Sequence, residues 1–189
     1  YTPQANYNGN DTFTYTLSDG NGGTDTARVD VTVTAVNDPP VANDDSMILD
    51  EDTYFTTEVL ANDTDVDGGP VSRSVTAVTQ GAHGTVVINP DNTVTYTPQA
   101  SYNGSDSFTY TVSDGIGTDT ATVSVTVNPR NDAPVAANDS GTTSEDTAVT
   151  ISVLTNDSDL DGDTLSITAA TSGAKGTVTF NVTSVTYTP

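Results

Sequence analysis

The sequence predicts an all-β protein made of tandem antiparallel β-sandwich domains. Three observations carry this prediction: a long internal repeat, apolar residues that alternate with polar ones, and turns rich in Gly, Asn and Asp. Alternation with a period of two buries one face of a strand and leaves the other in water. No window has the spacing of an amphipathic helix, so strands alone must supply the core.

The repeat consists of motifs that return in the same order about 94 residues later. The matching segments are residues 1–3 with 96–98 and 187–189, 7–11 with 102–106, 37–41 with 131–135, 51–53 with 145–147, and 62–68 with 156–162. This period has the length of a domain and far exceeds that of a solenoid repeat. The chain is therefore expected to contain tandem domains.

Short strands follow one another within each period. Residues 108–112 read Phe-Thr-Tyr-Thr-Val and residues 123–127 read Val-Ser-Val-Thr-Val, with apolar residues at every second position. About seven such strands fit into one repeat, as in a β-sandwich. The expected core of the central repeat is Val75, Val86, Ile88, Val94, Tyr96, Phe108, Tyr110, Val112, Val123, Val125 and Val127.

Composition excludes several classes of protein. The 189 residues include 26 acidic and 4 basic side chains, for a net charge of −22, so a nucleic acid backbone is not an expected partner. No apolar run is long enough to span a membrane. The absence of Cys excludes a disulfide framework and thiolate metal sites.

No arrangement of residues predicts catalysis. His83 is the only His, lies in a Gly-flanked turn, and has Lys175 as its counterpart in the next repeat, so neither a zinc site nor a nucleophilic site forms around it. Paired carboxylates could hydrolyse glycosides, but here they lie in repeated loops, and no Trp is present to stack on a sugar. We expect the protein not to be an enzyme.

The acidic residues gather in loops. Residues 62–68 and 156–162 each place three Asp at alternate positions before a Gly. Like charges so close together require a cation between them, and Ca²⁺ is coordinated by six to eight such oxygens in flexible loops. The loops are not EF-hands, because Ser74 and Thr168 stand where the twelfth-position Glu would be. The competing interpretation is a solubilising or salt-adapted surface, which would spread its acids over strand faces as well.

Several of these motifs resemble those of cadherins. Residues 131–135 (Asn-Asp-Ala-Pro-Val) resemble the linker, residues 145–147 (Glu-Asp-Thr) the acidic AB loop, and residues 156–162 the acidic BC loop. Residues 108–127 resemble the F and G strands that lead into the next linker. The chain is similar over its whole length to bacterial cadherin-like tandem repeats of large surface and adhesion proteins. The resemblance implies an Ig-like or cadherin-like sandwich.

The cadherin phase implies three segments. Residues 1–37 hold the last two strands (F and G) of one domain, residues 38–131 form a complete domain (called the middle domain below), and residues 132–189 hold the first five strands (A to E) of another. Two strands alone are marginal in water. Either residues 132–189 of one copy close on residues 1–37 of the next, giving a head-to-tail polymer by strand donation, or the sequence is a segment of a longer continuous chain.

The same phase implies where metal ligands gather. In such a sandwich the BC and FG loops share the linker end, and the AB and EF loops lie at the opposite end. The set expected at the first junction is Asp11, Asn37, Asp38, Asp44, Asp63, Asp65, Asp67 and Asp114. The set expected at the second is Glu51 and Asp52 from the AB loop, Asp106 from the EF loop, and Asn131, Asp132, Asp139, Asp157, Asp159 and Asp161. Each BC loop has three Asp where the family has two, so the coordinating pair stays open.

These features predict a secreted, extracellular segment of a cell-surface stalk, adhesin or filament. Ca²⁺ at the junctions would stiffen it, and its partners would be neighbouring repeats or other copies of itself. The alternative is an adhesion module that binds a glycan or another cell without structural metal. Such a module would carry an aromatic cluster or a loop insertion that its neighbours lack, and the copies here are nearly alike.

Overall fold

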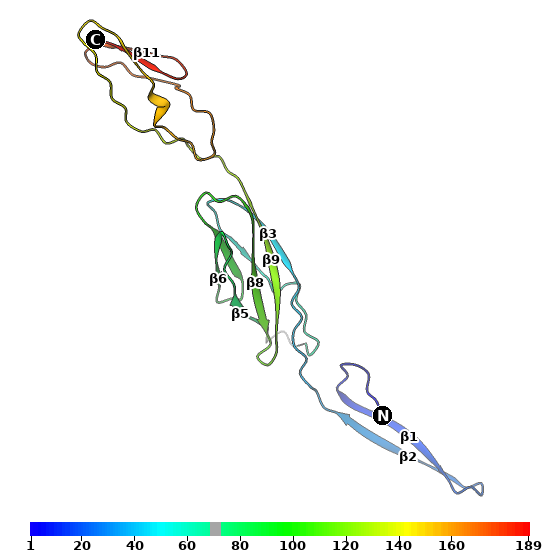
Figure 1. Ribbon diagram of the computed structural model, residues 1–189. Helices are drawn as coiled ribbons and strands as arrows, with labels where there is room; N and C mark the ends of the chain where they lie inside the picture. Colours follow the sequence, from blue (N-terminus) through cyan, green and yellow to red (C-terminus); the bar gives the residue numbers. More distant parts are fainter. Residues whose placement is uncertain (69–72) are drawn as a thin grey trace. The chain divides into compact units, whose positions relative to one another are not determined.

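The computed structural model describes residues 1–68 and 73–189, and strands joined by turns and loops are its main regular elements (Figure 1). It divides into two compact units, residues 1–128 and residues 129–189. A single turn of 3-10 helix, η1 (Val153–Thr155), interrupts the described strands. No described helix is long and apolar enough to cross a membrane. The all-β prediction is confirmed.

The middle domain is a two-sheet sandwich, whose strands in chain order are β3 (Asp45–Asp50), β4 (Phe55–Thr57), β5 (Ser74–Val78), β6 (Gly84–Ile88), β7 (Val94–Pro98), β8 (Gly104–Ser113) and β9 (Thr118–Asn128). One sheet has the order β3-β9-β8-β5 and the other β4-β7-β6 (Figure 1). Neighbouring strands are antiparallel except β3 and β9, which are parallel. These described strands match the expected number of about seven.

The core lies between the two sheets and follows the alternation in the sequence. Phe108, Tyr110 and Val112 on β8 retain at most 2% exposure. Burying a large apolar side chain contributes about 1.5–3 kcal/mol. Of the expected core residues, Ile88 alone is only partly buried. The core also contains Met47, Leu49, Val59 and Ala121, which the sequence analysis missed.

The N-terminal hairpin consists of β1 (Gly9–Ser18) and β2 (Thr24–Val33). These strands are the counterparts of β8 and β9, and they pair in the same antiparallel way. Phe13, Tyr15 and Leu17, the counterparts of the buried β8 residues, are 43%, 46% and 60% exposed. The hairpin therefore has the pattern of a core strand pair without a second sheet over its apolar face.

Residues 129–189 form one three-stranded sheet from β10 (Val149–Ile151), β11 (Thr177–Phe180) and β12 (Val185–Thr188). Its order, β10-β12-β11, repeats the order β4-β7-β6 of the middle domain. Five strands were expected here, and the two that do not form are the counterparts of β3 and β5. In the middle domain those two strands pair with β9 and β8. Residues 129–189 contain no counterpart of β8 or β9, so the two segments lack partners.

Candidate functional site

Three segments distant in sequence meet at one end of the middle domain, called the linker end below. They are the linker, residues 37–41, the acidic loop, residues 62–68, and the turn between β8 and β9. Val41 and Thr64 exchange two main-chain hydrogen bonds of 2.8 and 3.0 Å, which hold the acidic loop beside the linker. The Asn37 side chain donates to Asp114 Oδ2 at 2.9 Å, which ties the linker to the β8–β9 turn.

Carboxylates at the linker end are positioned by main-chain amides. The Asp38 amide donates to Asp67 Oδ2 at 2.5 Å, and the Asp67 amide donates to Asp65 Oδ1 at 3.0 Å. Asp114 Oδ1 accepts from the amides of Ile116 and Gly117 at 2.7 and 2.6 Å. The hydrogen bond from Asn37 is the largest cause that holds the pKa of the Asp114 carboxyl below its usual value, and the two amide hydrogen bonds add to it. Asn37, Asp38, Asp65, Asp67 and Asp114 thus occupy one region, as the sandwich topology predicts.

The same arrangement recurs in the second unit. The Asp132 amide donates to Asp161 Oδ2 at 2.6 Å, and the Asp161 amide donates to Asp159 Oδ1 at 3.0 Å. The Asn131 side chain donates to the Asp132 carbonyl at 2.7 Å. Val135 and Ser158 pair as Val41 and Thr64 do. The repeat therefore preserves this geometry as well as the residues.

Four of the predicted ligands behave differently from the outer carboxylates: Asp44 and Asp63 in the middle domain, and Asp139 and Asp157 in the second unit. Asp63 turns inward, retains 5% exposure, and accepts from the Asn43 amide and from the Tyr110 hydroxyl, both at 2.8 Å. Asp44 Oδ1 accepts from the Thr122 amide of β9 at 2.8 Å. In the second unit, Asp157 Oδ1 accepts from the Ala137 amide at 2.8 Å. Asp139 is exposed.

Asp106 and Asp11 lie within strands, not in loops. Asp106 was expected in the EF loop, but β8 already begins at Gly104, where the strand pairing with β9 starts. Its two oxygens accept from the Tyr96 hydroxyl (2.7 Å) and from the amides of Ala82, His83 and Ser107 at 3.0, 2.9 and 2.8 Å. A Ca²⁺ ion at Asp106 would have to displace at least one of these bonds.

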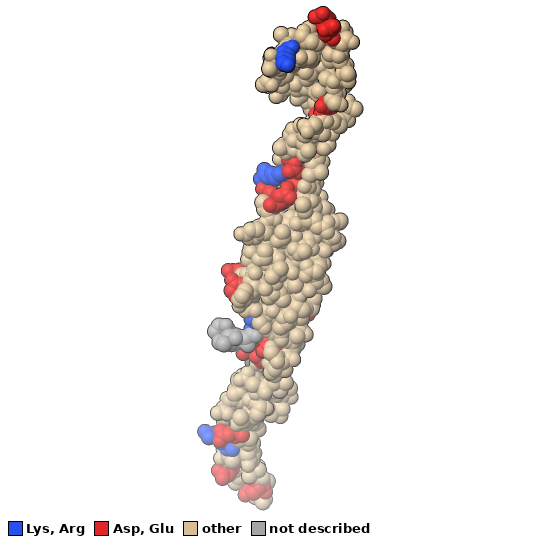
Figure 2. Space-filling model, turned by 90° about the vertical axis from the view of Figure 1, so that its left-hand side faces the viewer, with Lys and Arg blue, Asp and Glu red and all other residues tan. Residues whose placement is uncertain are grey.

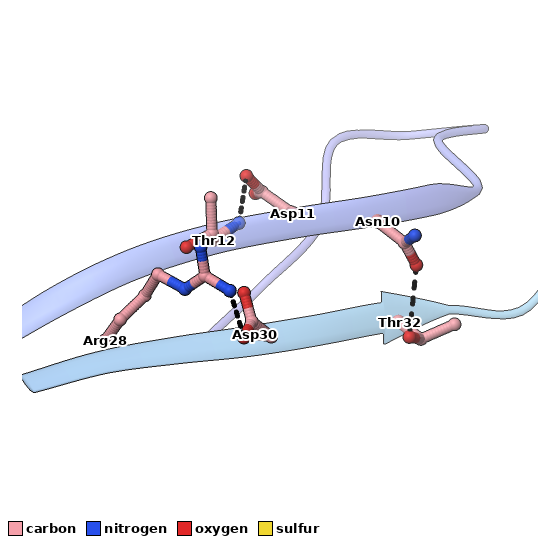
Figure 3. Close-up of polar contacts among 6 residues, drawn as sticks. All are labelled: Asn10, Asp11, Thr12, Arg28, Asp30 and Thr32. Carbon is pink, nitrogen blue, oxygen red and sulfur yellow. Dashed lines mark hydrogen bonds and ion pairs between the residues drawn. The ribbon is translucent and has the colours of Figure 1, made fainter.

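Asp11 repeats this arrangement on β1. It accepts from the Tyr1 hydroxyl at 2.7 Å and from the Thr12 amide at 2.8 Å. Figure 3 shows its carboxylate beside Thr12, close to the ion pair between Arg28 and Asp30 on β2, whose N–O distance is 2.7 Å. Asp11 thus fastens the start of its own strand.

At the opposite end of the middle domain, the β3–β4 turn meets the segment between β7 and β8. The Ser101 amide donates to Asp52 Oδ1 at 2.9 Å, and the Asn103 side chain donates to the buried Glu51 at 3.4 Å. This pairing of loops also follows the topology expected from the sequence. Glu51, Asp52 and Asp106 belong to the first compact unit, whereas the other residues predicted for the second junction belong to the second unit.

Carboxylates alone do not complete a metal site. Within residues 1–68 and 73–189, no three Asp, Glu or His side chains gather into a group that could hold a metal ion. On the face shown in Figure 2, the acidic side chains form separate groups with uncharged surface between them. Carbonyl and water oxygens would have to complete any Ca²⁺ site, which Ca²⁺ accepts. Calcium binding by the two predicted sets stays a prediction.

Sequence analysis missed two carboxylates at the linker end. Asp119 Oδ2 accepts from the Ala42 amide at 2.9 Å. Asp45, the first residue of β3, has one oxygen that is buried without a hydrogen-bond partner. The repeat contained the signal for Asp45: a shift of 94 residues pairs it with Asp139, whereas the neighbouring Asp44 corresponds to Asn138.

Comparison with known proteins gives a family match. The model of the bacterial Ig domain family matches residues 1–32, 37–126 and 131–189. None of the curated proteins matches the chain.

Among solved structures, an endo-fucoidan hydrolase from glycoside hydrolase family 107 is 22% identical, with a TM-score of 0.38. The match covers 100% of this chain and 30% of the hydrolase, so the chain spans less than a third of that protein. An I-band fragment of titin is 15% identical over 95% of this chain and 64% of its own length, with a TM-score of 0.34. Neither likeness bears on what this chain does.

Proposed function

Since the chain belongs to the bacterial Ig domain family, we propose that it is a structural repeat segment of an extracellular, cell-surface stalk, adhesin or filament. In this proposal the linker ends of its domains bind Ca²⁺, and the bound ions stiffen the junctions between neighbouring repeats. The narrower resemblance to bacterial cadherin-like repeats, and secretion of the protein, are part of the same proposal.

The repeated geometry of the linker ends is the observation that carries this proposal. Asp38 is held to Asp67 and, 94 residues later, Asp132 is held to Asp161. Each contact ties a linker to the acidic loop of the domain that follows it. A linker-to-loop contact that recurs at successive linkers fits a role at the junctions of an array, because no single repeat then carries a site that the others lack.

The donor set suits a hard cation. The linker end of the middle domain offers carboxylate oxygens of Asp65, Asp67 and Asp114 together with main-chain carbonyls, and the sequence has no Cys to favour a softer ion. Bound Ca²⁺ would neutralise part of the repulsion among these carboxylates. Without it, mutual repulsion favours a looser linker.

Thermal unfolding in EGTA and then in millimolar Ca²⁺ tests the metal. Extracellular Ca²⁺ sites have Kd near 10⁻⁴–10⁻³ M, so each occupied site should add about 1 kcal/mol or more. We expect a rise in Tm that NaCl of equal ionic strength does not reproduce. Asp67→Asn should reduce the rise, whereas Asp30→Asn, an exposed residue of β2 paired with Arg28, should leave it unchanged. An equal response to NaCl would identify a screened polyanion instead.

A second proposal concerns the hairpin β1–β2. Its exposed apolar face, with Phe13, Tyr15 and Leu17, lacks a covering sheet. In residues 129–189, the segments that correspond to β3 and β5 have no strands to pair with. In the middle domain, β3 pairs with β9 and β5 pairs with β8, and the hairpin strands β2 and β1 correspond to β9 and β8. We propose that the hairpin of one copy completes residues 132–189 of another, which gives a head-to-tail polymer.

Light scattering after size-exclusion chromatography tests the polymer. The 189-residue chain of 19.4 kDa should form species whose mass rises with concentration. Leu17→Asp should abolish association, because the counterpart Val112 is fully buried. Thr12→Asp should not, because its counterpart Ser107 is exposed. A monomer at all concentrations would contradict strand exchange and would leave the calcium proposal intact.

A further inference from the structure

The hydroxyl of Tyr110 lies within hydrogen-bond distance of more acceptors than it can donate to. Its oxygen is 2.8 Å from Asp63 Oδ1, 3.0 Å from the Asn43 carbonyl and 3.1 Å from the Val59 carbonyl. Tyr110 is fully buried, and a phenol has one hydrogen to donate. Three oxygens therefore surround a single proton donor.

Two carboxylate oxygens beside this hydroxyl have no partner at all. Asp63 Oδ2 and Asp45 Oδ2 are shielded from solvent and accept no hydrogen bond from the described residues. Both carboxylates act on Tyr110, whose pKa is raised by burial and then by Asp63 and Asp45.

The described part of the chain does not place a cation on these oxygens. Arg73 donates to the main-chain carbonyl of Asp63, not to its carboxylate. The ion pair between Arg28 and Asp30 lies far away in sequence, on β2. A buried carboxylate without a counter-charge is strongly unfavourable, and it is stabilised by taking up a proton or by a bound water or cation.

We propose that Asp45 and Asp63 bind one Ca²⁺ ion inside the linker end of the middle domain, beside Tyr110. The two carboxylates supply charge, and nearby main-chain carbonyls, such as those of Asn43 and Val59, and water complete the oxygen shell that Ca²⁺ requires. This site goes beyond the junction sites proposed above, because it lies within one domain and none of its ligands comes from residues 37–41. It shares with that proposal the choice of ion and one residue, Asp63, which the cadherin phase had assigned to the first junction.

The second unit provides an internal comparison. Asp139 and Asp157 are the counterparts of Asp45 and Asp63, and the Ala137 amide holds Asp157 as the Asn43 amide holds Asp63. Residues 129–189 include no counterpart of Tyr110, and there Asp139 is exposed and Asp157 half-buried. The same pair of acids without the covering strand should bind the ion far more weakly.

Terbium luminescence tests the site directly. Tb³⁺ substitutes for Ca²⁺ and emits when it accepts energy from a nearby aromatic ring, and this sequence has Tyr but no Trp. Titration of the full chain with Tb³⁺ should give a saturable signal that excess Ca²⁺ removes. Asp45→Asn should weaken Tb³⁺ binding at this site at least tenfold, whereas Asp30→Asn, an exposed residue of β2 that belongs to neither predicted ligand set, should leave the signal unchanged. An Asp45→Asn titration identical to that of the wild type would overturn the proposal.

Thermal unfolding supplies a second readout that also shows whether the variant folds. Asp45→Asn removes one of two facing charges, so its Tm should exceed that of the wild type in EGTA and respond less to Ca²⁺. An unchanged response to Ca²⁺ would rule out the buried site. If the junction sites fail but the buried site holds, Asp67→Asn leaves the Ca²⁺ response intact and Asp45→Asn abolishes it.

Discussion

The hairpins β1–β2 and β8–β9 are two copies of one sequence pattern in two environments. Residues 13–20 and 108–115 differ at one position, Leu17 against Val112. Both copies pair over the same register, yet the apolar face of the first is 43–60% exposed and that of the second 0–2%. Alternation thus determines which side chains share a face, and burial depends on the second sheet, β4-β7-β6, which only the second hairpin has.

Local anchors survive in both copies. The Tyr1 hydroxyl donates to Asp11 and the Tyr96 hydroxyl donates to Asp106, each at 2.7 Å. Tyr1 stacks on Phe13 with ring centroids 6.3 Å apart, much as Tyr96 stacks on Phe108 at 6.1 Å. These contacts span only ten or twelve residues, so they form with or without the rest of the domain.

The largest expected difference between the hairpins comes from truncating their aromatic anchors. Phe108→Ala should lower the free energy of unfolding by about 3–5 kcal/mol, because it opens a cavity in a closed core. Phe13→Ala should change the unfolding of the middle domain by less than about 0.5 kcal/mol. Urea unfolding at low protein concentration measures both. Similar losses for the two variants would mean that the first hairpin is covered in solution.

Removing one Tyr hydroxyl from each hairpin should also affect the two hairpins differently. Tyr110→Phe deprives Asp63 and two carbonyls of their shared donor inside the core, which should cost about 1–3 kcal/mol in the absence of Ca²⁺. Tyr15→Phe, the matched change on the exposed hairpin, should have no measurable effect on the unfolding of the middle domain. Urea unfolding in EGTA checks this pair, and a cost below about 0.5 kcal/mol for Tyr110→Phe would contradict it.

The smallest expected effect concerns acid stability. Desolvation raises the pKa of Asp106, but the hydrogen bonds from Tyr96, His83, Ser107 and Ala82 outweigh it, so the net pKa is lowered. The unfolded state then takes up the proton first. The stabilisation is fully present above the ordinary Asp pKa, near 3.9, and is lost as the pH falls through the lower folded value.

Asp106→Asn should therefore flatten the loss of stability of the middle domain below about pH 4. Asp11→Asn should not change that profile, because Asp11 lies on the exposed hairpin. Unfolding curves between neutral and acidic pH measure both. A profile that Asp106→Asn leaves unchanged would show that other carboxylates control acid unfolding.

The sequence predicted those parts of the molecule that depend on local pattern and repetition. The face formed by Phe108, Tyr110 and Val112 and the meeting of the linker with the acidic loop both followed from alternation and topology. The inward turn of Asp63 was not predictable, because it depends on Tyr110, 47 residues away, as its hydrogen-bond donor. Asp106 was placed in a loop because its motif resembles a turn, although the strand begins two residues earlier.

The two strands that do not form in residues 132–189 likewise depend on pairing with distant parts of the sequence. The counterpart of β5 (residues 166–170) keeps most of its residues but lacks the neighbour with which it would hydrogen-bond, whereas the counterpart of β3 also has Gly141 and Thr143 in place of Met47 and Leu49. Met47 and Leu49 on β3 escaped prediction for a related reason, because their burial requires a strand parallel to β9. Pairing over long sequence distances was therefore the information that the local pattern lacked.

The parallel pairing of β3 with β9 has a mechanical consequence. The first strand of the middle domain runs beside its last, with Asp45 opposite Val123 and Asp50 opposite Asn128. Tension applied through the two flanking linkers would pull these strands past each other along their length. The six residue pairs between them would then carry the force together, not one after another as in the peeling of a hairpin. In a cell-surface stalk, this pairing would make β3–β9 the contact that resists extension.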